Sequence, residues 1–118
     1  MRFVRAAAAS CAALGALLAA ADERSFTLVT VNGAVPEAQR VLRVTKGDKV
    51  TVTLTSNVPG EAHLHAYKLA AALAPGKRAQ WTFTAHATGR YRVEWHAAGD
   101  KPGDHHHAPL ATLEVMPR

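Results

Sequence analysis

The chain has 118 residues, of which 48% are hydrophobic and 19% charged, and its formal charge is +5 from 14 Lys and Arg against 9 Asp and Glu. This length and composition indicate a single globular domain and exclude an intrinsically disordered chain. One cysteine beside seven histidines excludes an internal disulfide framework and any site built from several thiolates.

The first 21 residues have the three-part pattern of a secretory signal peptide. Arg2 and Arg5 precede an uncharged run over residues 6–21, which ends in small residues that fit an A-x-A cleavage site, and charged residues begin at Asp22. A transmembrane anchor is the alternative, but a span needs about 20 predominantly apolar residues and this run is mostly alanine. A lipoprotein signal at Cys11 fits less well, because the apolar run continues beyond the cysteine.

Cleavage is expected after Ala21, which leaves a mature domain over residues 22–118 with no membrane span, or one residue earlier. Lys and Arg then fall from 14 to 12 against 9 acidic residues, so the net charge is only +3, and the only cysteine is lost. The remaining basic residues are scattered and form no block, which argues against a nucleic-acid partner. A periplasmic or secreted location is expected, and all seven histidines remain in the mature chain.

Alternation of apolar and polar residues with a period of two dominates from Ser25 onward and predicts β-strands. In chain order the pattern predicts strands over Phe26–Thr30, Leu42–Val44, Lys49–Thr55, His63–Leu69, Gln80–Ala85, Arg90–His96 and Leu113–Val115. The first strand is followed by an Asn32-Gly33 turn signal, and loops are expected over Ser56–Glu61 and Ala97–Pro109. A short helical turn is expected over Ala70–Ala74.

Short strands separated by Gly and Pro turns predict an all-β fold, an antiparallel Greek-key β-sandwich of about seven strands. A sandwich of this size can bury a core without disulfide staples. The residues predicted to form that core are the alternating apolar side chains Val50, Val52, Leu54, Trp81, Phe83, Tyr91, Val93 and Trp95.

The histidines are the residues that best support a chemical role. His63 and His65 are two positions apart on a predicted strand, so both side chains point to the same side, with Cα atoms about 6.5–7 Å apart. Two imidazoles at that spacing can bind one metal ion at about 2.0–2.1 Å from each nitrogen. The alternative is that one histidine is a hydrogen-bonded core residue and the other lies at the rim.

Further histidines follow the Arg90–His96 strand. His96 closes that strand, and the tract His105, His106 and His107 lies in the loop before the last strand, where a histidine-rich sequence is typical of metal binding. A solvated loop is the alternative. His86 is expected to be a surface residue at the opposite end of the sandwich. Three acidic residues, Asp48, Glu61 and Glu94, are expected to be isolated and exposed, which argues against a hydrolytic site.

The segment from Val41 to Val115 resembles the cupredoxins, the β-sandwich family of the small blue copper proteins. The matching stretches are VLRVTKGDKVTVTLTSN, GEAHLH at the position of the first copper histidine, APGKRAQWTFTA, GRYRVEWH and LATLEV. More narrowly, the chain is similar to cysteine-free cupredoxin-like domains of bacterial periplasmic proteins, including those associated with iron-uptake lipoproteins. The resemblance implies a metal site that uses one strand histidine, His63 or His65, and one loop histidine among residues 105–107.

Two departures from the blue copper pattern change that expectation. Trp95 stands about where the family has its cysteine ligand, and Met116 falls too late to be an axial ligand. A blue copper site with a thiolate is therefore excluded, and electron transfer is disfavoured. An all-imidazole site prefers Cu(II), Zn(II) or Ni(II), and Cu(II) leads in affinity.

The sequence therefore predicts an exported metal-binding protein that holds a divalent ion, copper first and zinc or nickel as alternatives. The metal ligands are expected among His63, His65, His96, His105, His106 and His107. The expected role is metal binding, delivery or sequestration, with a periplasmic metal-transport or acceptor protein as partner, and not catalysis. The competing hypothesis is a metal-free sandwich that serves as an interaction or structural module.

Overall fold

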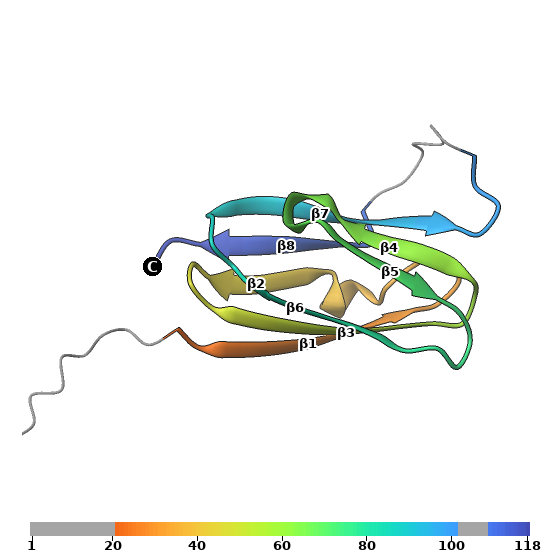
Figure 1. The fold of residues 1–118 in the computed structure, drawn as a ribbon, viewed down its shortest axis with the longest axis horizontal. Coiled ribbons are helices and arrows are strands. Elements are labelled where there is room, and N and C mark those ends of the chain that lie inside the picture. The colour runs from red at the N-terminus through yellow and green to blue at the C-terminus, as the bar shows by residue number, and fades with distance from the viewer. Residues whose placement is uncertain (1–20, 102–108) are drawn as a thin grey trace, which may run out of the picture.

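The computed structural model describes residues 21–101 and 109–118, which form eight strands and two short 3-10 helices (Figure 1). The strands are β1 (Glu23–Thr30), β2 (Val41–Thr45), β3 (Lys49–Ser56), β4 (Gly60–Leu64), β5 (Leu69–Leu73), β6 (Ala79–Thr84), β7 (Gly89–Ala97) and β8 (Ala111–Met116). The 3-10 helices are η1 (Glu37–Gln39) and η2 (His65–Tyr67). Neither helix in this part of the chain is long and apolar enough to cross a membrane.

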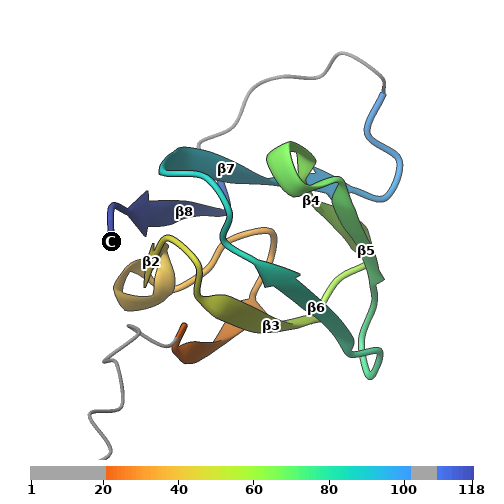
Figure 2. The ribbon, with the colours of Figure 1, turned by 60° about the vertical axis from the view of Figure 1, so that its left-hand side comes forward.

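The strands form two sheets that face each other across one core, as Figures 1 and 2 show. The smaller sheet has the order β1-β3-β6, and the larger sheet has the order β2-β8-β7-β4-β5. The predicted all-β sandwich is confirmed, with eight strands where about seven were expected. The pairs β1–β3 and β2–β8 are parallel, and the remaining pairs in these sheets are antiparallel.

Strand β3 shows why this sequence folds as a sandwich. Val50, Val52 and Leu54 alternate with threonines, and all three apolar side chains are at most 1% exposed. Val52 lies opposite Trp81 in the register with β6, so the period-two pattern places large side chains of both strands in the core. Burying each Val or Leu contributes about 1.5–3 kcal/mol, and this strand therefore anchors the smaller sheet.

The predicted core is largely confirmed. Five of the expected residues are buried, namely Val50, Val52, Leu54, Trp81 and Val93. Phe83, Tyr91 and Trp95 are only partly buried and pack against the core from its margin. Trp and Tyr rings are commonly buried only in part, because of their size and their polar tip.

The turn predicted after the first strand is present. Asn32 and Gly33 have φ angles of 52° and 80°, and the flanking residues Val31 and Ala34 bond to each other through their backbones. Two consecutive positive φ angles define the tight turn that an Asn-Gly pair favours. The backbone N–H of Asn32 also donates to the side chain of Asn57 at 2.7 Å, which fixes this turn against the end of β3.

Two local predictions in the middle of the chain are wrong. The expected strand over His63–Leu69 ends at Leu64, and η2 begins at His65. Lys68 then takes a left-handed conformation with φ of 55° before β5 starts. The expected helical turn over Ala70–Ala74 is instead strand β5. Alanine favours helix by itself, but Ala71 pairs with Ala62 of β4 and is buried, so the tertiary pairing decides the conformation.

Candidate metal centre

The candidate site lies on the outer face of the larger sheet, where β4 and β7 run side by side in opposite directions. In the register, His63 lies opposite Glu94, and Glu61 lies opposite His96. The intervening residue of β4, Ala62, is fully buried. Side chains alternate between the two faces of a strand, so these two Glu–His pairs form a four-residue group on the solvent face.

His65 joins this group from the turn that follows β4. The η2 turn closes with a bond from the Lys68 N–H to the His65 carbonyl, at 3.0 Å, and it holds the His65 ring beside the strand. The rings of His63 and His65 are stacked, with centroids 5.0 Å apart and planes inclined by 15°. The expectation that both imidazoles lie on one side therefore agrees with the structure, although the second one is outside the strand.

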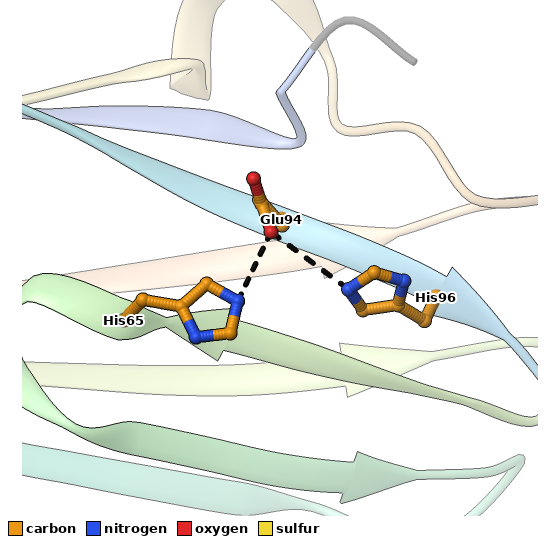
Figure 3. A group of neighbouring side chains, drawn as sticks. All are labelled: His65, Glu94 and His96. Carbon is orange, nitrogen blue, oxygen red and sulfur yellow. Dashed lines mark hydrogen bonds and ion pairs between the residues drawn. The ribbon is translucent and has the colours of Figure 1, made fainter. Parts of the chain in front are cut away.

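Glu94 stands between two imidazoles (Figure 3). Its Oε2 atom lies 3.1 Å from Nε2 of His65 and 3.8 Å from Nε2 of His96. His65, Glu94 and His96 each offer one ligand atom, and these three atoms all lie within 4.8 Å of one another. Two imidazole nitrogens and one carboxylate oxygen are suitable donors for Cu(II), Zn(II) or Ni(II), so these residues fit a divalent ion.

His63 is the fourth donor next to this group. Its ring centroid is 5.0 Å from that of His96, in an edge-to-face arrangement, and its Nε2 lies 3.4 Å from Oε1 of Glu61. Burial lowers the pKa of His63, and the neighbouring His96 and His65 lower it further, against the opposing effect of Glu61 and Glu94. A lowered pKa keeps this imidazole neutral at neutral pH, which is the form that binds a metal.

The structure brings together three of the six histidines that the sequence predicts as ligands: His63, His65 and His96. The other three, His105, His106 and His107, lie outside the described residues. His86 is exposed, as expected, and its ring lies 4.9 Å from that of Tyr67.

The expectation that the acidic residues are isolated is wrong for Glu94 and Glu61. Glu94 is a member of the three-residue group, and Glu61 pairs with His63. A signal for Glu94 was present in the sequence, since a residue two positions before His96 on the same strand shares its face. The pairing with β4 depends on a register between distant segments, and the sequence pattern alone does not show it.

The expectation for Asp48 is also wrong. Its side chain is 0% exposed, and its carboxylate pairs with Arg118 at 2.8 Å and with Arg24 at 3.5 Å. Burial by itself raises the pKa of Asp48, but backbone N–H groups of Thr45 and Asp22 and the two guanidiniums outweigh it, so the pKa is lowered. Asp48 lies directly before β3 of the smaller sheet, where Arg24 and Arg118, one near each end of the domain, contact it.

Trp95, expected near the position of the family's cysteine, lies on the opposite face of β7 from Glu94 and His96. It packs so closely against Gly60 that a Cβ atom there would overlap its ring, and a Cβ at Gly33 would lie 3.1 Å from its Nε1. The indole therefore fills the inner side of the sheet beneath the histidines. The candidate metal ligands of this chain lie on the outer side of the sheet.

Comparison with solved structures shows the class of fold. A chain of a heme-copper terminal oxidase dimer is similar with a TM-score of 0.63 and 19% identity, over 80% of this chain and 65% of that chain. A blue copper oxidase from Nitrosomonas europaea is similar with a TM-score of 0.58 and 20% identity, over 82% of this chain and 40% of that chain. The periplasmic domain of subunit II of the cytochrome oxidase of Bradyrhizobium japonicum gives a TM-score of 0.58 and 14% identity, over 79% of this chain and 83% of that one.

These neighbours have the cupredoxin fold, so the chain has a cupredoxin-like fold and the resemblance inferred from the sequence is confirmed at that level. The sequence matches no family model and no curated protein. The chain spans about two fifths of the blue copper oxidase and just under two thirds of the heme-copper oxidase chain.

Proposed function

We propose that this chain is an exported, periplasmic copper-binding protein of cupredoxin-like fold. Its proposed metal ligands are His65, Glu94 and His96, with His63 beside them as a fourth. The observation that carries this proposal is the position of Glu94, whose Oε2 lies between the Nε2 atoms of two histidines from different segments.

Copper is the ion that the donors and the neighbours favour together. Among divalent first-row metals, Cu(II) has the highest affinity for nitrogen and oxygen ligands, and imidazole suits it well. Two solved structures with this fold are described as a blue copper oxidase and a copper-containing nitrite reductase, although each is less than 25% identical to this chain. Zinc and nickel accept the same donors and are the competing ions.

The site's exposure supports delivery or sequestration as the role, with a periplasmic acceptor protein as partner. The side chain of His65 is 66% exposed, and those of Glu94 and His96 are 37% and 38% exposed. An ion on this face is open to ligand exchange with another protein. The proposed role is binding and transfer, and not catalysis.

The test is a calorimetric titration of Cu(II), Zn(II) and Ni(II) into the processed protein and into a His65→Asn/His96→Asn variant. The double variant is expected to bind Cu(II) about a hundredfold more weakly or worse, because it loses two of the four proposed ligands. His86→Asn is the matched control, since His86 is an exposed histidine outside the group, and its affinity is expected to equal that of the wild type.

A second variant separates this site from the histidine tract of the sequence. Replacing His105, His106 and His107 by serine is expected to leave the high-affinity Cu(II) site in place. Saturation at 100 times the dissociation constant is expected to stabilise the wild type by about 2.7 kcal/mol. Equal Cu(II) affinity in the wild type and the His65→Asn/His96→Asn variant would overturn the proposed site, and no thermal stabilisation by any of the three ions would favour the metal-free interaction module.

A further inference from the structure

Asp48 is a completely buried carboxylate at the place where the two ends of the domain meet. Its Oδ1 atom accepts from Arg118 at 2.8 Å and from the backbone N–H of Asp22 at 3.2 Å. Its Oδ2 atom accepts from the backbone N–H of Thr45 at 2.9 Å and lies 3.5 Å from Nε of Arg24. A buried anion is stable only when such donors surround it, and one of these donors is the nitrogen of Asp22.

The position of that nitrogen is fixed by the sheet. The carbonyl of Asp22 accepts from the N–H of Lys49 at 2.9 Å, directly before the first register pair of β1 and β3, Glu23 with Lys49. Ala21 and Asp22 are both exposed. The peptide bond between them is therefore accessible, and breaking it leaves the contact with Lys49 intact.

The sequence places the expected cleavage site at this same bond, since alanines occupy positions 19 and 21 and Asp22 follows. We propose that Asp48 is the binding site for the α-ammonium group that processing creates on Asp22. An endopeptidase specific for small residues at these positions would hydrolyse the Ala21–Asp22 bond with one water molecule, which leaves a carboxylate on Ala21 and an ammonium group on Asp22. The proposal rests on the export part of the proposed function and is independent of the metal site.

Processing then replaces a neutral N–H donor by a charged one at the same place. A hydrogen bond between two charged groups is about twice as strong as a neutral one, so the processed domain is more stable than one with residues still attached before Asp22. The charged side chains around the pair are Arg24, Arg118 and the carboxylate of Asp22 itself, which lies 3.5 Å from Arg24. The two guanidiniums repel the new ammonium group and reduce the gain, and the carboxylates of Asp48 and Asp22 oppose that repulsion.

The contact has a defined pH dependence. A carboxylate beside the ammonium group raises the pKa of that amine above its ordinary value. Its contribution to stability is therefore complete below the ordinary pKa of an α-amino group and is lost as the pH rises through the raised pKa. The α-amino group is the one whose ordinary pKa, about 7.7–8.0, lies in this range.

The test compares two exported chains whose first residue is verified by mass spectrometry. One begins at Asp22, and the other has a leader altered so that one glycine precedes Asp22. Both contain every strand that the structure describes, since β1 begins at Glu23. The glycine-extended chain is expected to melt on the order of 4–8 °C lower at pH 6, with the difference disappearing near pH 10 and in an Asp48→Asn background.

A chemical readout keeps the proposal testable if Asp48→Asn fails to fold. Acetylation of the α-amine by limiting acetic anhydride is followed by peptide mass spectrometry in the folded protein and in urea. The amine of Asp22 is expected to react at least about tenfold more slowly in the folded chain, whereas the amine of the added glycine is expected to show less protection.

Three results would overturn the proposal: an exported chain that begins at another residue, equal melting temperatures for the two chains, or equal acetylation rates in folded and unfolded protein. The Cu(II) affinities of the two chains are expected to be equal. A failure here therefore leaves the proposed metal site standing, and a failure of metal binding leaves this contact standing.

Discussion

The carboxylate of Glu94 lies 3.1 Å from the imidazole of His65, although the two residues are 29 positions apart and only one of them is in a strand. Glu94 projects from the middle of β7, and His65 opens the η2 turn that follows β4. The contact therefore ties the turn to the sheet. It also places a negative charge among three imidazoles, and this charge favours a divalent cation over a neutral ligand.

Glu94→Gln tests the contribution of this carboxylate to metal binding. Glutamine keeps the shape of the side chain but removes its charge, so Cu(II) affinity is expected to fall about tenfold or more. The titration is accompanied by electron paramagnetic resonance, in which the loss of one charged oxygen ligand changes the copper spectrum. Glu114→Gln is the control, because Glu114 lies on the same sheet but pairs with Arg43 and Arg90. Unchanged affinity in Glu94→Gln would show that Glu94 is not a ligand.

His63 gives the metal-free protein a defined dependence of stability on pH. Its pKa is lowered in the folded state, mainly by burial, so the unfolded chain binds a proton at this residue more readily than the folded chain does. The free energy of unfolding therefore falls as the pH drops below the ordinary pKa of histidine and levels off below the lowered pKa. His63→Gln removes this contribution and is expected to lose less stability than the wild type between about pH 8 and pH 5.

The measurement is urea unfolding at a series of pH values in the presence of a chelator. His86→Gln is the matched control, since it removes an exposed histidine outside the group. If the free energies of unfolding of His63→Gln and the wild type change equally with pH, the effect of burial on the pKa of His63 is contradicted.

The sandwich could be predicted from the sequence because its strands carry local signals. Val50, Val52 and Leu54 alternate with threonines, and Asn32-Gly33 marks a turn whose φ angles need those residue types. These patterns act over a few neighbouring residues. Local preference and tertiary pairing compete in alanine-rich β5, where pairing with β4 holds the chain extended and the predicted helical turn is wrong.

The candidate site was predictable in its histidines but not in its acidic residues. His63 and His65 are close in sequence, so their shared side followed from strand geometry even though the strand ends between them. The contact of Glu94 with His65 depends on the register of β4 with β7, and the buried carboxylate of Asp48 is paired with Arg24 and Arg118, which lie far from it in the sequence. Both the strand register and these ion pairs between distant residues depend on the whole fold. A pattern of neighbouring residues in the sequence does not predict them.

Gly60 is expected to tolerate no larger residue, because its missing side chain makes room for Trp95. A Cβ atom at Gly60 would overlap the indole ring and would lie 2.8 Å from the carbonyl oxygen of His96. Gly60→Ala must therefore displace the indole or the β7 backbone, at a cost of about 1–3 kcal/mol. The displacement reaches His96, so Cu(II) affinity is expected to fall together with stability.

Urea unfolding and Cu(II) titration of Gly60→Ala check both effects. Gly76→Ala is the control: a Cβ there meets nothing within 4 Å, and only its φ of +76° opposes the change, at a cost of about 1–2 kcal/mol. Gly76→Ala is expected to leave Cu(II) affinity unchanged. Wild-type stability and affinity in Gly60→Ala would contradict the close packing of Trp95 against this strand.

Arg118 is expected to stabilise the domain through Asp48 although it is the last residue of the chain. Its Nη2 lies 2.8 Å from the buried carboxylate, and its Nε donates to the carbonyl of Lys46 at 2.9 Å. Arg118→Met removes both contacts, while Arg24 and two backbone N–H groups still hold Asp48. The expected loss is therefore about 1–2 kcal/mol at neutral pH, less than for a buried carboxylate left without any cation.

The pH dependence separates this charge effect from lost packing. The lowered pKa of Asp48 means that its stabilising contribution is complete above the ordinary pKa of aspartate and is lost as the pH falls through the lowered value. The free energies of unfolding of Arg118→Met and the wild type, measured in urea, are thus expected to converge in acid. Arg90→Met is the control, because Arg90 is 76% exposed in its pair with Glu114, and its loss is expected to cost under about 1 kcal/mol. A difference for Arg118→Met that stays constant into the acid range would assign its effect to packing and not to the charge of Asp48.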